Sequence, residues 1–440
     1  MYDVIIIGGG PGGYPCAVRC AQYGLKACLI EEKELGGICL NKGCIPTKSL
    51  FAISEELGKS RYGSIKKETS LAAGWEGVLK EIKTDVILRL RTGVSFLLKQ
   101  NGIDFVQGHG KIAGKNSVQV GDRTIEGKNI VVATGGTPCT PAICRTDKRT
   151  LSSDDLWDTE SLPESIAIVG GGVIGCEFAS ILNRFGVKIT LYEMADTLLP
   201  GKDADIVSTL KNSMAKAGIQ VFTGKKIESI DEIKEKKIIV AVGRMPNLSA
   251  AGDIGLETEN GRLKTGASMR TNIENIYAVG DVNGKYPYAY IATKEGEVAA
   301  ANIAGRENAA MDYEDIPETI FAKPEIGLCG MTEKQAKDSG RSVKTGKFPF
   351  AALGKAYAEK HTEGFVKVVA DSGTEEILGI HIIGKGATEL VAFSTLAIKN
   401  RLKIESLEKM LFCHPTYAEG IMEAAEDVNK KSIHLPPVKK

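Results

Sequence analysis

The sequence has no excess of charge of either sign. Lys and Arg together number 56 and Asp and Glu 55, which gives a formal net charge of +1. A nucleic-acid-binding surface normally shows as an excess of basic residues. With 43% hydrophobic and 25% charged residues, the composition is that of an ordinary globular protein. We therefore expect no nucleic-acid partner and no extended disorder.

The sequence also lacks a hydrophobic run that could cross a membrane. Its longest apolar stretch, roughly residues 166–182, is interrupted by four glycines and by Glu177, whereas a membrane helix needs about 20 apolar residues. The chain enters a glycine-rich loop directly after residue 7, with no basic and apolar leader before it. We expect a cytoplasmic protein without a membrane span, and its 440 residues predict about three domains.

One nucleotide-binding pattern is present, and it begins at the first apolar run. Residues 4–7 have the composition of a buried parallel strand, and a glycine-rich turn and a predicted helix follow. Gly8 permits a tight turn, Gly10 lets the backbone approach a pyrophosphate, and Gly13 lets the helix pack closely on the strand. Glu31 ends the next predicted strand, where its carboxylate can accept a hydrogen bond from a ribose hydroxyl.

The same pattern occurs a second time. A predicted strand at residues 166–169 precedes Gly170, Gly172 and Gly175, and Glu193 ends the following strand. The interval from the first glycine to the acid is 23 residues in both copies (31 − 8 and 193 − 170). Two dinucleotide sites are the leading interpretation; one site beside a degenerate structural duplicate is the alternative.

The second acid also bears on the choice of dinucleotide. Glu193 would repel a 2′-phosphate, and no arginine occurs between residues 193 and 200 to receive one. The sequence therefore favours NAD over NADP.

Two cysteines follow the first nucleotide pattern at the spacing C-x-x-x-x-C. Cys39 and Cys44 would form a redox pair if they lay on the first turns of a helix, where the helix dipole lowers a thiol pKa. Spacing alone leaves two unrelated buried cysteines as an alternative, because Cys139 and Cys144 have the same spacing. That second pair lies in a Pro/Thr-containing loop near a predicted domain junction, and we assign it no chemistry. The other cysteines suggest no metal cluster.

The segment from Gly36 to Lys48 resembles the flavoprotein disulfide reductases, and among them the dihydrolipoamide dehydrogenase branch. The resemblance extends almost from end to end, because further segments are similar to family motifs in the family's order. These segments are 89–99, 108–112, 133–136, 241–247, 275–281 and 414–419.

The resemblance implies a set of catalytic residues. Cys39 would be the thiol that meets the substrate disulfide, and Cys44 the thiol next to the flavin. His414 would be the catalytic base, oriented by Glu419 and supplied by the partner subunit. Lys48 and Glu177 would form an ion pair beside the flavin.

The resemblance also implies FAD and NAD as cofactors and no metal. The residues expected to bind FAD are Gly8, Gly10, Gly13, Glu31, Lys48, Gly110, Thr134, Gly135, Gly136, Asp281 and Ala289. Those expected to bind NAD are Gly170, Gly172, Gly175, Glu177, Glu193 and Gly243.

The fold that the resemblance implies is α/β, with two Rossmann-like domains, for FAD and for NAD, and a C-terminal α+β dimerisation domain. The expected ranges are 1–141 for the FAD domain, 142–246 for the NAD domain, 247–311 for a central domain that completes the FAD site, and 312–440 for the interface domain.

The implied activity is oxidation of protein-bound dihydrolipoyl groups coupled to reduction of NAD to NADH. The enzyme would be a homodimer, and its lipoyl group would be carried by another protein, of a 2-oxoacid dehydrogenase or a glycine cleavage system. Two alternatives stay open: an NAD(P)H-dependent reductase of another disulfide, and a flavin-binding adaptor or sensor without disulfide chemistry. Because Cys39, Cys44, His414 and Glu419 are all present, we favour an enzyme over the adaptor.

The chain departs from the family pattern in three places. Residues 226–237 stand where the family commonly has a three-stranded meander, and they are too few for three strands. Phe412 and Cys413 precede His414 where a family histidine often stands, and the sequence Tyr-Ala-Tyr at 288–290 replaces a common Leu-Ala-His. We expect these changes to alter the NAD contacts and the shape of the substrate channel.

Two further local patterns give structural expectations. The segment 75–99 predicts a long helix, and 364–370 and 377–383 predict two strands joined by a turn. The residues expected to share the buried face of the long helix are Ile87, Leu90, Val94, Leu97 and Leu98.

Overall fold

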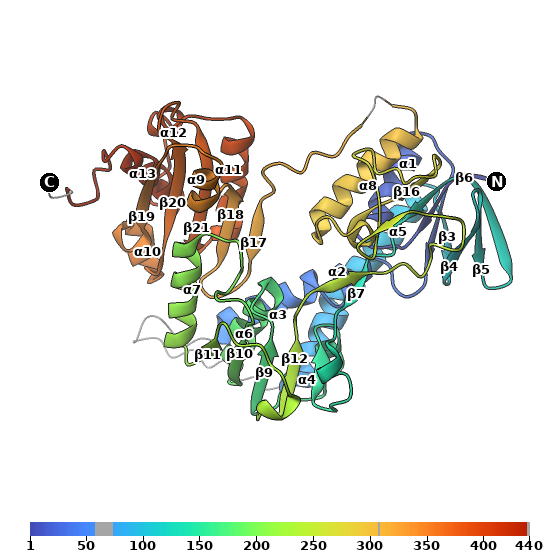
Figure 1. Ribbon diagram of the computed structural model, residues 1–440, viewed down its shortest axis with the longest axis horizontal. Coiled ribbons are helices and arrows are strands. Elements are labelled where there is room, and N and C mark those ends of the chain that lie inside the picture. The colour runs from blue at the N-terminus through green and yellow to red at the C-terminus, as the bar shows by residue number, and fades with distance from the viewer. Residues whose placement is uncertain (58–73, 307–308, 438–440) are drawn as a thin grey trace.

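The computed structural model describes residues 1–57, 74–306 and 309–437, and these form three sheets with their helices (Figure 1). The first sheet has a parallel core in the order β3-β2-β1-β6-β16, extended by the antiparallel strands β5 and β4. Val4 to Ile7 of β1 are almost fully buried, as expected for a central parallel strand covered on both faces. The strands are β1 (Tyr2–Ile7), β2 (Ala27–Glu31), β3 (Asp104–Gln107), β4 (Gly110–Gly114), β5 (Ser117–Val120), β6 (Arg123–Val132) and β16 (Ile276–Ala278).

Strand β16 comes from the segment expected to complete the FAD site, and it lies beside β6 in the first sheet. Helix α8 follows it in the chain and packs against α1. Residues far apart in the sequence therefore build one domain around the first glycine turn. The helices of this part are α1 (Gly13–Gln22), α2 (Gly37–Asn41), α3 (Cys44–Leu57), α4 (Gly74–Glu81), α5 (Leu88–Gln100) and α8 (Ala289–Ile303).

The second sheet is parallel throughout, in the order β11-β10-β9-β12-β8. Its strands are β8 (Thr150–Ser152), β9 (Ser165–Val169), β10 (Lys188–Tyr192), β11 (Gln220–Phe222) and β12 (Lys237–Val240), and its helices are α6 (Val173–Arg184) and α7 (Ala204–Lys216). Between β11 and β12 the chain forms only one short 3-10 turn, Ile230–Glu232. The connection is accordingly too short to hold the three-stranded meander that is common in the family.

Two short pairings connect or flank these sheets. β7 (Gly136–Pro138) pairs antiparallel with β13 (Arg244–Pro246), and β14 (Thr258–Glu259) pairs with β15 (Arg262–Leu263). The first pairing places the chain that leaves the first sheet beside the chain that leaves the second.

The third sheet is antiparallel, in the order β17-β18-β21-β20-β19. Its strands are β17 (Glu318–Ile320), β18 (Ile326–Gly330), β19 (Val343–Pro349), β20 (Gly364–Asp371) and β21 (Ile377–Gly384). The predicted hairpin of β20 and β21 is confirmed. Helices α11 (Ala387–Lys399) and α13 (Glu419–Val428) pack on this sheet, and α9 (Glu333–Asp338), α10 (Gly354–Glu359) and α12 (Ile404–Glu408) complete the domain.

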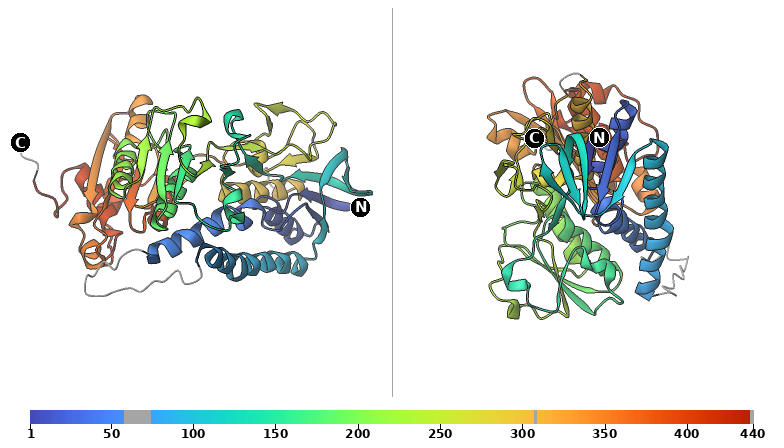
Figure 2. Two further views of the ribbon diagram at one scale, coloured as in Figure 1. Left: turned by 90° about the horizontal axis from the view of Figure 1, so that it is seen from below. Right: turned by 90° about the vertical axis from the view of Figure 1, so that its right-hand side faces the viewer.

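The predicted helix at 75–99 is present but is not a uniform α-helix. A π-helical segment, Ile82–Ile87, joins α4 to α5, and the whole rod runs along one edge of the molecule (Figure 2). The prediction was wrong for Leu90 and Leu97, whose residues are 44% and 45% exposed. Since successive helical residues are rotated by about 100°, both lie about 60–80° away from the buried line of Ile87, Val94 and Leu98.

Within the described residues, no helix combines the length and the apolar composition that a membrane crossing requires.

Candidate functional site

A cavity of about 1490 Å³ lies between the first two sheets. Gly8 and Gly10 of the first glycine turn and Gly170 and Gly172 of the second all line it. Pockets for one drug-sized ligand usually measure about 300–1000 Å³. The volume and the two turns therefore suit two dinucleotides in one continuous space.

The two glycine turns have nearly the same backbone geometry. Gly8 and Gly170 have φ values of +110° and +115°, where an L side chain is strained. A Cβ on Gly13 or on Gly175 would lie 1.8 Å from the carbonyl oxygen of the first glycine of its turn. These glycines are thus required by the fold of each strand–turn–helix unit.

The middle glycines are different, because the protein leaves space beside them. The nearest atom to a Cβ on Gly10 would be the Gly37 Cα, at 3.8 Å, and a Cβ on Gly172 would meet nothing within 4 Å. Both positions face the cavity, so a side chain there would fill space that a pyrophosphate needs. The residues present therefore fit the expected dinucleotides, and the helices α1 and α6 direct their N-termini to the same places.

The two strand-terminal carboxylates are fixed in matching ways. Glu31 accepts hydrogen bonds from the backbone amides of Gly9, at 2.6 Å, and Lys33, at 2.7 Å. Glu193 accepts hydrogen bonds from the backbone amides of Gly171, at 2.6 Å, and Ala195, at 2.7 Å. Each carboxylate is held rigidly at the edge of the cavity beside its glycine turn.

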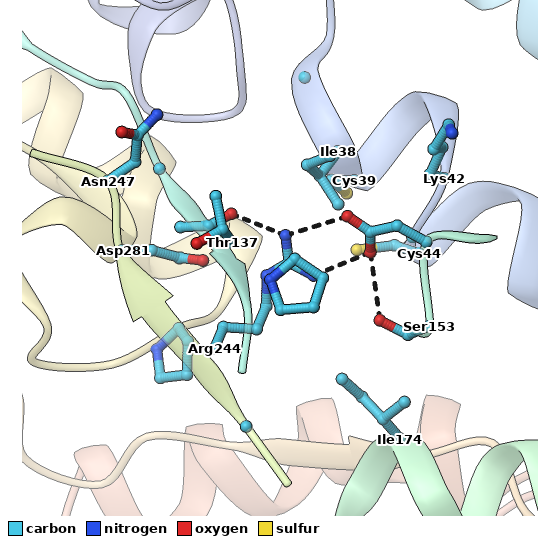
Figure 3. A pocket seen from close by; sticks show the side chains of 18 of the residues that line it. Ile38, Cys39, Lys42, Cys44, Thr137, Ser153, Ile174, Arg244, Asn247 and Asp281 are labelled. Atoms are coloured by element: carbon cyan, nitrogen blue, oxygen red, sulfur yellow. Dashed lines mark hydrogen bonds and ion pairs between the residues drawn. The ribbon is translucent and has the colours of Figure 1, made fainter. Parts of the chain in front are cut away.

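Cys39 and Cys44 line the cavity together. Cys39 lies on α2, and Cys44 is the first residue of α3, where the helix dipole favours a thiolate. The hydrogen bond from the Cys39 thiol lowers the pKa of Cys44 to about 7, and the nearby Lys48 ammonium adds to this effect. The same hydrogen bond and burial raise the pKa of Cys39. Figure 3 shows both sulfurs on one side of the cavity and Asp281 on the other.

Lys48 and Glu177 form the expected ion pair. The Lys48 Nζ lies 3.0 Å and 2.9 Å from the two carboxylate oxygens, and the pair joins α3 to α6. The Glu177 side chain is only 6% exposed and also accepts a hydrogen bond from the amide of Phe321, at 2.9 Å. The ammonium lies 4.6 Å from the centre of the Phe321 ring. Both charges are therefore compensated at the inner wall of the cavity.

The expected flavin-contacting segments converge on the same space. The Thr134 hydroxyl donates to the Asn247 carbonyl, at 2.6 Å, and so joins the segments that leave the first two sheets. Burial raises the pKa of the Asp281 carboxyl, and the buried Glu295 accepts from the amide of Gly280, at 2.6 Å. The other expected residues that line the cavity are Gly110, Gly135, Gly136, Gly243 and Ala289.

His414 and Glu419 lie together, but not at this cavity. The imidazole Nδ1 is 2.8 Å from a Glu419 oxygen, and the other oxygen accepts from the Thr416 amide, at 2.7 Å. The bond at Nδ1 leaves Nε2 as the nitrogen that can exchange a proton. The His414 side chain is 75% exposed, and neither residue is among the described residues that line the cavity.

Several polar and aromatic residues of the cavity have no role in the expectations from the sequence. Arg244 pairs with Asp154, at 2.9 Å, and donates to the Gly136 carbonyl, at 2.7 Å. The rings of Tyr288 and Tyr290 stack, with centroids 5.5 Å apart. The Arg244 partner had no local signal, because it lies 90 residues away. For the two tyrosines, the only indication in the sequence was that Tyr-Ala-Tyr replaces the family's common Leu-Ala-His.

The second cysteine pair of the same spacing has different surroundings. Cys144 is buried, and burial raises the pKa of its thiol. In the part of the chain that the structure describes, no group of three or more metal-ligating side chains is present.

Family models and known proteins agree on what this chain is similar to. The family described as pyridine nucleotide-disulphide oxidoreductase matches residues 2–296, and its dimerisation domain matches residues 316–425. A dihydrolipoyl dehydrogenase of Bacillus subtilis is 38% identical, and one of Thermus scotoductus 36%; in both comparisons the match covers 99% of each chain. The HOCl-induced flavoprotein disulfide reductase RclA of Escherichia coli matches with a TM-score of 0.88 and 26% identity, over 97% of this chain and 99% of that one.

Proposed function

The chain belongs to the pyridine nucleotide-disulphide oxidoreductase family, and on that premise we propose that it oxidises dihydrolipoyl groups through the Cys39–Cys44 pair and reduces NAD. It is an FAD-dependent, NAD-linked enzyme, as are its dihydrolipoyl dehydrogenase relatives at 34–38% identity. The observation that carries the proposed chemistry is that both cysteines and both glycine turns line the same cavity.

The redox chemistry of the cysteines follows from their different pKa values. With the pair oxidised, a substrate thiolate attacks the Cys39 sulfur, the Cys39–Cys44 bond breaks, and Cys44 leaves as a thiolate. The second substrate thiolate then attacks the mixed disulfide, which closes the substrate disulfide and releases the Cys39 thiol. The substrate loses two electrons and the cysteine pair gains them. A leaving thiol with a pKa of about 7 leaves more readily than one of ordinary pKa.

The electrons need acceptors beyond the cysteines. When bound, FAD would supply a two-electron acceptor in the cavity that Cys44 lines, and NAD would supply the final hydride acceptor. The residues that would hold FAD are the first glycine turn, Glu31, Thr134 and Asp281, and those that would hold NAD are the second turn and Glu193. Lys48 stabilises the Cys44 thiolate, because its ammonium lowers the pKa of that thiol, and Glu177 holds the ammonium in place.

A substrate dithiol is mostly protonated at neutral pH, so the first attack needs a base. We assign this role to His414, with Glu419 orienting the imidazole through Nδ1. Proton transfer by a positioned histidine is typically worth about 10²–10⁴ in rate. Because His414 does not line the cavity of its own chain, the base at each cavity would be His414 of the partner subunit.

A homodimer with shared sites is therefore part of the proposal. The dimerisation-domain match at residues 316–425 supports it. So do exposed apolar side chains on α5, where Phe96 is 59% exposed, and next to His414, where Leu411 is 95% exposed. A dimer that buried these side chains would remove apolar surface from water.

The shared site is tested by mixing inactive Cys39→Ser chains with inactive His414→Gln chains under conditions of subunit exchange. Verified hybrid dimers should regain activity, because one of their two sites contains neither substitution. If verified hybrids stay inactive, the base acts within its own chain.

We further propose a lipoyl-bearing partner of a 2-oxoacid dehydrogenase or glycine cleavage system, and a cytoplasmic location. The location is supported by cysteine usage, because six of the ten cysteines are buried, as small hydrophobic residues are, and structural disulfides are rare in the cytosol.

A second candidate function is the reduction of another disulfide. The aromatic pair Tyr288 and Tyr290 favours it, because it changes one wall of the cavity from the family's common form. Steady-state assays separate the candidates: NADH formation from dihydrolipoamide and NAD is compared with NADH oxidation by glutathione disulfide. Absence of dihydrolipoamide turnover, with turnover of another disulfide, would replace the first proposal with the second.

A further inference from the structure

Two lysines lie at the end of the cavity where Glu193 stands, although they are more than 30 residues away from Glu193 in the sequence. Lys225 and Lys226 follow β11 in the chain, yet both line the cavity together with Glu193 and Glu228. The backbone makes this proximity firm, because the Lys225 amide donates to the Glu193 carbonyl, at 2.9 Å. The cavity therefore contains positive groups beside the expected ribose acceptor, where an NADP site would place them.

The Lys225 ammonium is neutralised by a carboxylate from the shortened connection. Its Nζ forms an ion pair with Glu232, in the 3-10 turn that replaces the meander. The other Glu232 oxygen accepts from the amides of Glu228, at 2.9 Å, and Ser229, at 3.0 Å. These contacts lower the pKa of Glu232 to about 2, with the Lys225 interaction as the largest cause. The carboxylate is thus charged and fixed in direction at neutral pH.

The second lysine is paired less firmly. Lys226 lies 3.1 Å from Glu228, and both side chains are about 70% exposed. Exposed pairs of this kind contribute little energy. Glu232, which is held by a capping box and by Lys225 together, is the fixed element of this charge group.

We propose that Glu232 is a specificity residue for the dinucleotide: by pairing with Lys225 it removes the cation that would otherwise bind a 2′-phosphate beside Glu193. This inference rests on the proposed function, and it adds a second determinant to the repulsion by Glu193. A 2′-phosphate carries up to about two negative charges at neutral pH. With Lys225 paired with Glu232 and Lys226 with Glu228, the carboxylates of Glu193 and Glu228 at this end of the cavity oppose a 2′-phosphate.

The test is isothermal titration of the flavin-loaded protein with NADH and with NADPH. In Glu232→Gln the affinity for NADPH should rise at least about tenfold, which corresponds to about 1.4 kcal/mol, while the affinity for NADH stays within a factor of about three. Adding Lys225→Met to this variant should remove the gain. Glu232→Ala, which removes the carboxylate together with its capping contacts, should give the same gain as Glu232→Gln.

Glu235→Gln is the matched control, because it makes the same charge change in the same segment at a carboxylate that accepts from the Lys234 amide, at 3.1 Å, while Lys225 pairs with Glu232. An equal gain in the control would replace the specific pair with a general charge effect. If neither Glu232 variant gains affinity for NADPH while NADH still binds, the inference about Glu232 is wrong and the proposed function is unaffected. If the unsubstituted protein fails to bind NADH at all, the proposed function fails with it.

Discussion

Replacing Gly175 by alanine tests the claim that Gly175 is required for packing of the second glycine turn, whereas Gly172 leaves space for the pyrophosphate. A Cβ at this position would lie 1.8 Å from the Gly170 carbonyl oxygen. Real Cβ atoms are almost never closer than 3.0 Å to a neighbour, so the start of α6 or the end of β9 must move by about 1.2 Å (3.0 − 1.8). Overpacking costs about 1–3 kcal/mol, and a backbone neighbour favours the upper value. The higher helix propensity of alanine over glycine offsets up to about 1 kcal/mol of this cost. The free energy of unfolding should therefore fall by about 2 kcal/mol.

Gly172→Ala is the matched variant, because a Cβ there meets nothing within 4 Å. Its stability should change by less than about 0.5 kcal/mol, yet its methyl group enters the space expected for the pyrophosphate. Urea unfolding followed by circular dichroism measures stability, and isothermal titration with NADH measures binding. Both variants should bind NADH at least about tenfold more weakly, and only Gly175→Ala should unfold at lower urea. Equal destabilisation of the two variants, or full NADH affinity in Gly172→Ala, would refute this division of roles.

Three further predictions address the cysteines and the dinucleotide. Cys39→Ser and Cys44→Ser should each abolish dihydrolipoamide turnover in steady-state assays while FAD stays bound, and Cys139→Ser should do neither; equal losses in all three would mean that the wrong pair was chosen. Lys48→Met should raise the pKa of Cys44 above about 7, because the thiolate loses a neighbouring cation; alkylation of the reduced protein, mapped by mass spectrometry, should then reach its half-maximal rate at higher pH, and an unchanged midpoint contradicts the assignment. Glu193→Arg should weaken NADH binding and improve NADPH binding in titrations, since it exchanges a ribose acceptor for a phosphate partner; an unchanged preference would exclude Glu193 as a determinant.

The parts of the fold that the sequence predicts well are those specified by local steric rules. Gly13 was expected to allow close packing of helix on strand, and the 1.8 Å approach to the Gly8 carbonyl shows why no side chain fits there. The β20–β21 hairpin was likewise visible as two β-branched runs around a turn. Such features depend on neighbours in the chain, so a short window contains the necessary information.

Features that depend on distant residues were not predictable in this way. The pairing of Arg244 with Asp154 and the position of Lys225 beside Glu193 arise only when separate strands meet at a sheet edge. The exposure of Leu90 and Leu97 was missed for a different reason. An apolar stripe shows which residues share a broad face of a helix, but the width of the buried line depends on what packs against it.

The catalytic assignments came from family resemblance and not from spacing. Cys39–Cys44 and Cys139–Cys144 have the same spacing, and only their surroundings distinguish them. Cys44 begins a helix and lies near Lys48, whereas burial raises the pKa of Cys144. That difference in electrostatics was set by the fold, where no local pattern could show it.

Anaerobic titration of the flavin-loaded protein with dihydrolipoamide tests most directly whether Cys39 and Cys44 pass substrate electrons to the cofactors. The unsubstituted protein should accept one two-electron equivalent per subunit and develop a long-wavelength thiolate-to-flavin absorbance, and later addition of NAD should yield NADH. Cys44→Ser should bind FAD but show neither the absorbance nor the NADH. An unsubstituted protein that dihydrolipoamide does not reduce, or a Cys44→Ser protein that is reduced at the same rate, would contradict the account.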